Sequence, residues 1–258
     1  MITTEIAELL DTESRRINSP DFIARDPVQF PRLFSDLRDI EITSLLCSAI
    51  AWGNRTMICR DCEKMLTLMG HNPYHYVMEQ GYEDLPDCNI HRTFFAANLR
   101  HFLRGLHLIY SRFDSIDTMA AHHHIGDDEF PAWKLVEYLN AYLAEANHGA
   151  TDSRCLPLNL RTTALKRVNM ALRWLVRNDG IVDMGVWRSI RPSQLYIPLD
   201  VHVGNTAREL GLITRKSNDR TTTVELTRTL RTLRPDDPVV YDYALFGIGV
   251  DGLLQELK

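Results

Sequence analysis

Lys166 and Asp200 have the side chains and the sequence settings that covalent catalysis by an amine requires. Lys166 lies on the apolar helical pattern "LKRVNMALRWLVR" and is followed directly by Arg167. An amine nucleophile must be partly neutral, so it needs burial or a cationic neighbour. Asp200 follows the apolar approach "YIPL" and precedes another helical pattern. The pair therefore suggests a lysine nucleophile with an assisting carboxylate.

Each of the two residues also has an ordinary structural interpretation. Asp200 stands where an N-cap stands, and such a cap contributes about 1 kcal/mol. Lys166 could lay its methylene stem on the apolar surface and keep its charge in water. The chain has only five lysines, and Lys166 alone lies on an apolar helix shortly before Asp200. The catalytic interpretation is favoured, and the structural one stays open.

The charge distribution is uneven along the 258 residues, whose formal net charge is −5. Residues 154–234 contain 15 Lys and Arg against 6 Asp and Glu, a net charge of +9. The rest of the chain contains 14 against 28, a net charge of −14. A polyanion such as DNA would be attracted to the basic region. Solvated arginines on helix faces would give the same count, so charge alone does not decide.

Helical periodicity dominates the sequence, and long alternating runs typical of strands are missing. The pattern predicts an all-α fold without a linker that cleanly divides the chain. The segment "DIEITSLLCSAIAW" is apolar on nearly every face, so it is expected to be a buried helix. The expected helices span residues 2–17, 39–52, 56–69, 91–113, 129–146, 161–178, 201–211, 219–233 and 237–249.

The cysteines and histidines give weak signals for metal binding. The five cysteines are scattered, which argues against a disulfide framework. Cys59 and Cys62 form a C-x-x-C on an expected helix, but no second ligand pair lies nearby. The adjacent histidines 122–124 cannot all face one ion without contortion and are expected in a surface loop. No metal site is predicted.

Three segments occur in an order that resembles the helix-hairpin-helix DNA glycosylase superfamily. They are the buried helix with its turn, "LLCSAIAWGNRT", the lysine helix "LKRVNMALRWLVR", and "IPLDVHVGNTARELGL" followed by "DPVVYDYALFGIG". The superfamily has a [PV]-[VL]-D-x-H segment after a lysine-bearing helix, and often a final Ala-Leu-Phe-x-x-Gly. The resemblance covers about residues 40–70 and 155–250. It is greatest to an uncharacterised bacterial branch near the archaeal 8-oxoguanine DNA glycosylases.

The resemblance implies a fold and a reaction. The fold would be a single two-lobed helical domain over residues 1–258, with double-stranded DNA containing a damaged base in the cleft. The reaction would be base-excision repair by a bifunctional glycosylase/AP lyase, with an oxidised purine as the leading substrate. Lys166 would attack the anomeric carbon and form a Schiff base. Asp200 would position the amine and stabilise positive charge on the sugar.

The sequence departs from the superfamily at the hairpin that grips a DNA phosphate. Typical members read L-P-G-V-G there, whereas this chain reads "CLPLNLRTTALK". Leu156 and Pro157 remain, but the glycines are missing, so a tight nest of backbone amides is not expected. Arg154 and Arg161 would supply phosphate contacts through their side chains instead. This departure also favours the alternative, a non-catalytic nucleic-acid-binding protein that retains the fold.

A glycosylase must stack the extruded base between aromatic or apolar groups. Candidates for this pocket or for a wedge are Trp52, Trp174, Trp187 and Phe246. Core packing is the commoner role of each except Trp52, for which the two roles are equally favoured. Asn54 could read a base edge, fill the gap left by the base, or end a helix in the left-handed conformation. His202 either contacts a phosphate or points away from the site. Arg167 is a further candidate for DNA binding.

Cofactors and location follow from what the sequence contains. No glycine loop for a phosphate-bearing cofactor occurs, so no organic cofactor is expected; the resemblance allows a structural monovalent cation. No apolar run reaches the roughly 18 residues of a membrane helix, and the N-terminus has no apolar signal region. We therefore expect a cytoplasmic protein with no membrane association, and we infer no protein partner.

Overall fold

The computed structural model describes residues 2–252, and it confirms the predicted all-α class. Within these residues no helix is long and apolar enough to cross a membrane. One two-stranded sheet, β1 (Asn89–His91) with β2 (Phe94–Phe95), interrupts the helices. The α-helices are α1 (Thr4–Ile17), α2 (Pro20–Ile23), α3 (Leu37–Ala49), α4 (Arg55–Leu68), α5 (Pro73–Met78), α6 (Ala96–Tyr110), α7 (Ile116–His122), α8 (Pro131–Ala146), α9 (Lys166–Val176), α10 (Val201–Glu209), α11 (Arg220–Arg231) and α12 (Tyr241–Asp251). The short 3-10 helices are η1 (Pro27–Gln29), η2 (Pro31–Leu33), η3 (Ile125–Asp127), η4 (Pro192–Gln194) and η5 (Pro238–Val240).

Three expected helices begin four or five residues later than the sequence pattern predicts. The helix expected at 237–249 starts at Tyr241, because η5 precedes it. The helix expected at 91–113 starts at Ala96, because His91 and Phe94 pair in the antiparallel sheet instead. The helix expected at 161–178 starts at Lys166, because Leu165 takes a left-handed backbone conformation with φ +50°. Side chains with a β-carbon rarely adopt this conformation, so Leu165 fixes a sharp entry into α9.

Short polar side chains start several of the helices. Asp36 accepts a hydrogen bond from the Arg38 amide at the start of α3, and Asp219 accepts one from Thr222 at the start of α11. Such caps satisfy backbone donors that have no partner within the helix. They fix where each helix begins, and thus which residues its first turn presents.

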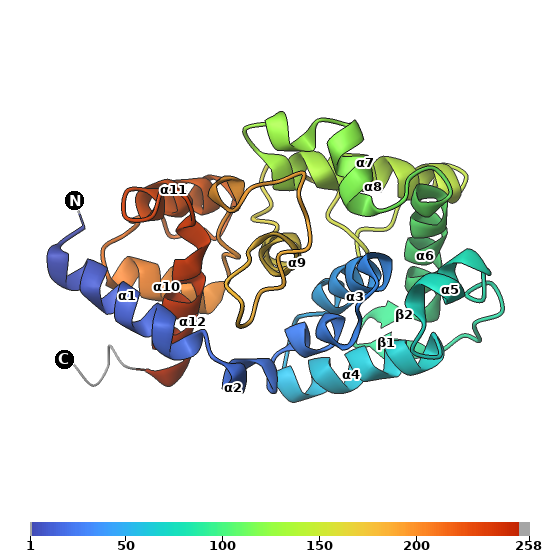
Figure 1. The fold of residues 1–258 in the computed structure, drawn as a ribbon, viewed down its shortest axis with the longest axis horizontal. Coiled ribbons are helices and arrows are strands. Elements are labelled where there is room, and N and C mark those ends of the chain that lie inside the picture. Colours follow the sequence, from blue (N-terminus) through green and yellow to red (C-terminus); the bar gives the residue numbers. More distant parts are fainter. Residues whose placement is uncertain (1, 253–258) are drawn as a thin grey trace.

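The buried apolar side chains form two clusters, and α9 lies in the middle of the molecule in Figure 1. The larger cluster joins α3 through α9, and α3 packs directly on α9. The smaller cluster joins α10, α11 and α12 with Leu10 of α1. Helix α1 packs along α12, so the N-terminal helix covers the C-terminal part of the fold. Residues from opposite ends of the chain are thereby brought to α9.

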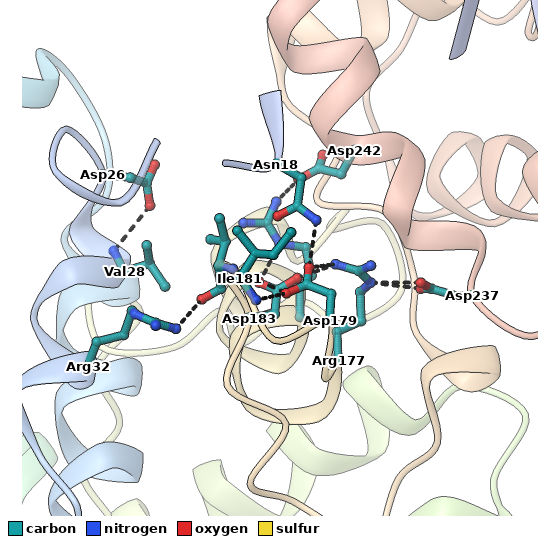
Figure 2. Close-up of polar contacts among 12 residues, drawn as sticks. Asn18, Asp26, Val28, Arg32, Arg177, Asp179, Ile181, Asp183, Asp237 and Asp242 are labelled. Atoms are coloured by element: carbon teal, nitrogen blue, oxygen red, sulfur yellow. Dashed lines mark hydrogen bonds and ion pairs between the residues drawn. The ribbon is translucent and has the colours of Figure 1, made fainter. Parts of the chain in front are cut away.

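A buried network of ion pairs ties α9 to the C-terminal part (Figure 2). Arg173 of α9 binds Asp242 of α12 and lies 3.2 Å from Asp183. Arg177 binds Asp183 at 2.5 Å and Asp237 at 2.9 Å. Removing one partner of such a network leaves an uncompensated buried charge, which costs about 3–5 kcal/mol. The network therefore holds α12 in a fixed position relative to α9.

Candidate active site

Lys166 and Asp200 line the same cavity, whose volume is about 850 Å³. The cavity takes Ile58 and Met170 from the larger apolar cluster, and Leu199 and Val203 from the smaller one. It therefore lies where the two clusters meet. Figure 1 shows the contributing helices α4, α9, α10 and α12 around this part of the molecule. A large, mostly apolar cavity with a few charged groups is the usual form of a ligand site.

Lys166 is the first residue of α9, and its surroundings disfavour the charged form of its amine. Burial lowers the pKa of Lys166, and the nearby Arg167 guanidinium lowers it further. The negative charges of Asp200, Asp26 and Asp242 oppose this shift without cancelling it. The N-terminus of a helix also carries partial positive charge, which is unfavourable for a cation. These are the conditions under which a lysine amine becomes nucleophilic.

Asp200 is the N-cap of α10, as its sequence position indicates. Its Oδ1 accepts a hydrogen bond of 2.9 Å from the Val203 amide. Its backbone carbonyl accepts a hydrogen bond of 3.0 Å from the Asn218 side chain, which also lines the cavity. The cap and the Asn218 contact fix the backbone on both sides of the carboxylate. Asp200 can therefore cap its helix and present negative charge to Lys166 at once.

Trp52 forms one wall of the cavity and is held from two sides. The Arg167 guanidinium lies 5.1 Å from the centre of the Trp52 ring. The backbone carbonyl of Trp52 accepts a hydrogen bond of 2.9 Å from Nε2 of His91, which is buried. Nδ1 of His91 contacts Asp61 at 2.7 Å. Because a carbonyl oxygen only accepts, His91 presents an N–H to Trp52 and is oriented by Asp61.

Phe246 lines the cavity from α12, as the resemblance implies for a pocket residue. The Arg55 guanidinium lies 4.9 Å from the centre of its ring, and Phe22 approaches it edge-on at 6.3 Å. His202 also lines the cavity, with its ring 6.4 Å from that of Phe246, while remaining exposed. The structure thus brings His202 to the rim of the cavity.

Three of the predicted pocket residues lie elsewhere. Trp174 and Trp187 belong to the buried core, 0% and 2% exposed, and neither is part of the cavity lining. Asn54 is the N-cap of α4 and accepts a hydrogen bond from the Met57 amide. Its φ of −73° is extended, so the left-handed interpretation is wrong. That conformation belongs to Gly53 beside it, whose φ is +103°.

The arginines predicted to contact DNA are divided among several places. Arg167 is directed inward, where it donates to the Ala49 carbonyl and faces Trp52. Arg154 is exposed on the segment before α9. Arg161 lines a separate groove of about 630 Å³ together with Arg220 and Arg228. The structure therefore places Arg161 on a basic surface and Arg167 inside the candidate site.

Four charged residues of the cavity were not anticipated from the sequence, and one of them is Arg55. Asp26, Arg173 and Asp242 all line it, and all three are buried. Burial raises the pKa of Asp242 to about 6, although its partner Arg173 opposes the shift. The only available signal was an aspartate within the apolar pattern "YDYALF". Asp26 offers no local signal, because it reaches the cavity only through packing of the N-terminal segment.

The described residues contain no group of three or more His, Cys, Asp or Glu side chains that could hold a metal ion. All five cysteines are free, including Cys59 and Cys62 on α4. In the histidine run, His123 stacks on Tyr138 with ring centres 4.0 Å apart.

The fold is all-α, and one cavity is lined by Lys166 together with Asp26, Asp200 and Asp242. The chain belongs to the family described as a protein of unknown function, DUF2400, whose model matches residues 26–251. No curated protein and no solved structure matches the chain. The matched range includes every cavity residue discussed above except Phe22.

Proposed function

We propose that this protein is a helix-hairpin-helix DNA glycosylase with AP lyase activity, acting in base-excision repair. The observation that carries the proposal is that Lys166 and Asp200 line one cavity and interact electrostatically there. The sequence order of these two residues is the most specific part of the resemblance. The meeting of two apolar clusters at the cavity supports the two-lobed arrangement that the superfamily has.

The cavity wall has the composition that an extruded base requires. Trp52 and Phe246 are aromatic surfaces, and each carries an arginine over its ring. Base-flipping enzymes stack the base between aromatic or apolar side chains and bind its edge by hydrogen bonds. The basic region of residues 154–234 would attract the DNA backbone, with Arg154, Arg161 and the rim residue His202 as phosphate contacts.

The proposed reaction uses the neutral amine of Lys166. Its nitrogen forms a bond to C1′ of the damaged nucleotide, the glycosidic bond breaks, and the base leaves with that electron pair and a proton. One amine proton leaves with the base, and the other passes to O4′ as the C1′–O4′ bond breaks and the sugar opens to a Schiff base. Removal of a C2′ proton then breaks the bond from C3′ to the phosphate oxygen and nicks the strand. Asp200 orients the amine and stabilises positive charge on the sugar.

Borohydride trapping tests this proposal directly, because the reagent reduces a Schiff base to a stable covalent adduct. Purified protein is incubated with one duplex that contains an abasic site and one that contains 8-oxoguanine. We expect adducts with both in the wild type and with neither in Lys166→Ala. The matched control is Lys134→Ala, which removes a lysine that is paired with Glu137 on α8. Full trapping by Lys166→Ala would disprove the assignment of the nucleophile.

The same assay separates the alternative function. An adduct with the abasic duplex alone retains the lyase and excludes 8-oxoguanine as the substrate. Salt-dependent duplex binding without any adduct would identify a non-catalytic nucleic-acid-binding protein. The segment before α9 favours this alternative, because Leu156 and Pro157 are not followed by the glycines of the superfamily's L-P-G-V-G hairpin. If the protein neither binds a duplex nor forms an adduct, both functions are excluded.

A further inference from the structure

Asp26 is a buried carboxylate with an unused oxygen in the candidate site. Its residue is 7% exposed, and it lines the 850 Å³ cavity. Its Oδ1 accepts a hydrogen bond of 3.1 Å from the Val28 amide. Within residues 2–252, Oδ2 has no hydrogen-bond partner. Figure 2 shows Oδ1 directed to Val28 and the other oxygen pointing away from it.

Oδ2 is not one of the fully buried side-chain atoms that lack a partner, so it is accessible from the cavity and free to accept a hydrogen bond from a ligand. Arg173, Arg55 and Lys166 all interact favourably with the charge of Asp26. None of the three forms a hydrogen bond or an ion pair with it, and Arg173 is already bound to Asp183 and Asp242. Burial raises the pKa of Asp26, and these three cations oppose that shift only in part. The second oxygen of Asp26 stays available to a ligand.

The ligand class follows from what a carboxylate accepts. An ionised carboxylate has only acceptors, and its two oxygens can receive two parallel N–H donors. Among the Watson–Crick edges of the nucleobases, that of guanine alone presents two adjacent N–H donors, the ring N1–H and the 2-amino group. Adenine and cytosine place an acceptor beside their amine, and thymine and uracil place carbonyls on both sides of the ring N–H.

We propose that Asp26 determines base specificity by accepting hydrogen bonds from N1–H and the 2-amino group of a guanine-type base held in this cavity. The inference rests on the proposed function for its cellular substrate, an oxidised guanine in DNA. Trp52 and Phe246 provide the aromatic surfaces beside this contact. Lys166 lines the same cavity, so a base bound at Asp26 brings its sugar toward the amine.

The decisive variant is Asp26→Asn. Asparagine keeps the oxygen that accepts from Val28 but replaces the free oxygen with an amide donor, which would face the donors of the base. The matched control is Asp21→Asn, an exposed residue of α2. A second test leaves the protein unchanged and alters the ligand: 8-oxoinosine lacks only the 2-amino group of 8-oxoguanosine. Binding of both nucleosides is followed by quenching of tryptophan fluorescence.

We expect the wild type and Asp21→Asn to bind 8-oxoguanosine about 10- to 100-fold more tightly than 8-oxoinosine. Asp26→Asn should lose that preference. On DNA, Asp26→Asn should reduce excision of 8-oxoguanine at least about 10-fold more than it reduces borohydride trapping on an abasic duplex, which contains no base to recognise.

The outcomes separate this inference from the proposed function. Equal binding of the two nucleosides by the wild type, or no binding of either, would overturn the role of Asp26. An unchanged preference in Asp26→Asn would overturn it as well. If the wild type forms no adduct on abasic DNA but prefers 8-oxoguanosine through Asp26, the lyase proposal fails and the guanine-type site stands.

Discussion

At the scale of single residues, the site depends on a lysine kept where its charge is unfavourable. Lys166 begins α9, close to Arg167 and largely shielded from water, and three aspartates only partly offset these effects. Residues held in unfavourable settings often serve function at some cost in stability. Lys166 therefore allows a stability test that does not depend on any substrate.

Replacing Lys166 by methionine should raise the free energy of unfolding at pH 7, because it removes a charge that burial disfavours. The folded state lowers the pKa of Lys166, so the unfolded state binds more protons and wild-type stability rises with pH toward about 10. The advantage of Lys166→Met should therefore shrink as pH increases. Urea denaturation at several pH values measures this difference. A variant less stable than wild type at pH 7 would contradict the prediction.

Asp200 has two roles, and two substitutions separate them. Asparagine caps helices about as well as aspartate, so Asp200→Asn should unfold at nearly the wild-type denaturant concentration. Asp200→Ala should lose about 1 kcal/mol, because the Val203 amide then lacks its acceptor. Both variants should lower the rate of borohydride trapping, since both remove the charge beside Lys166. Wild-type trapping by Asp200→Asn would leave Asp200 with the capping role alone.

At the scale of elements, buried polar contacts position helices that apolar packing alone would leave free to shift. Glu41 of α3 is fully buried and accepts from the Ile116 and Asp117 amides at the start of α7, at 2.8 and 2.9 Å. The hydroxyl of Tyr110 on α6 donates to the same carboxylate at 3.1 Å. One side chain thus joins three helices.

The Glu41 contact predicts a pH dependence of stability. Burial raises the pKa of Glu41 to about 7, and its hydrogen bonds only partly oppose this. The folded state then binds more protons than the unfolded state between about pH 4.5 and 7, so wild-type stability should fall across this range. Glu41→Gln cannot titrate, and the stability difference should shift in its favour as pH rises. Thermal unfolding at several pH values measures this shift, and Glu8→Gln, at an exposed position, is the control. Parallel plots of stability against pH for the wild type and Glu41→Gln would refute the prediction.

Local pattern was enough to predict the helices that carry Lys166 and Asp200, because hydrophobic periodicity and capping residues act over a few positions. It missed the β1–β2 hairpin, where Phe94 and Phe95 read as part of a longer apolar helix. It also missed Asp26, because only the packing of the N-terminal segment beside α9 reveals that this carboxylate faces the cavity. Trp187 was predicted as a pocket residue but lies in the core, because the sequence does not distinguish a core tryptophan from one that lines a pocket.

At the scale of the whole molecule, the acidic and basic parts of the chain serve different tasks in the proposed function. The acidic remainder gives the protein its net charge of −5, while residues 154–234 carry +9. Part of that positive charge is neutralised internally, because Arg173 and Arg177 are buried in ion pairs. The field available to DNA therefore comes from the exposed arginines, and Arg161, Arg220 and Arg228 share one groove.

Salt dependence of duplex binding tests this division. Each phosphate contact contributes about −0.9 to the slope of log K against log salt. If Arg161 contacts a phosphate, Arg161→Ala should weaken binding of every duplex to a similar extent and make the slope shallower by about 1. Fluorescence anisotropy across a salt series measures both quantities. Arg15→Ala removes another exposed charge, on α1 and outside the basic region, and should leave the slope unchanged. Equal effects of the two substitutions would mean that DNA is attracted by overall charge and that the groove makes no phosphate contact through Arg161.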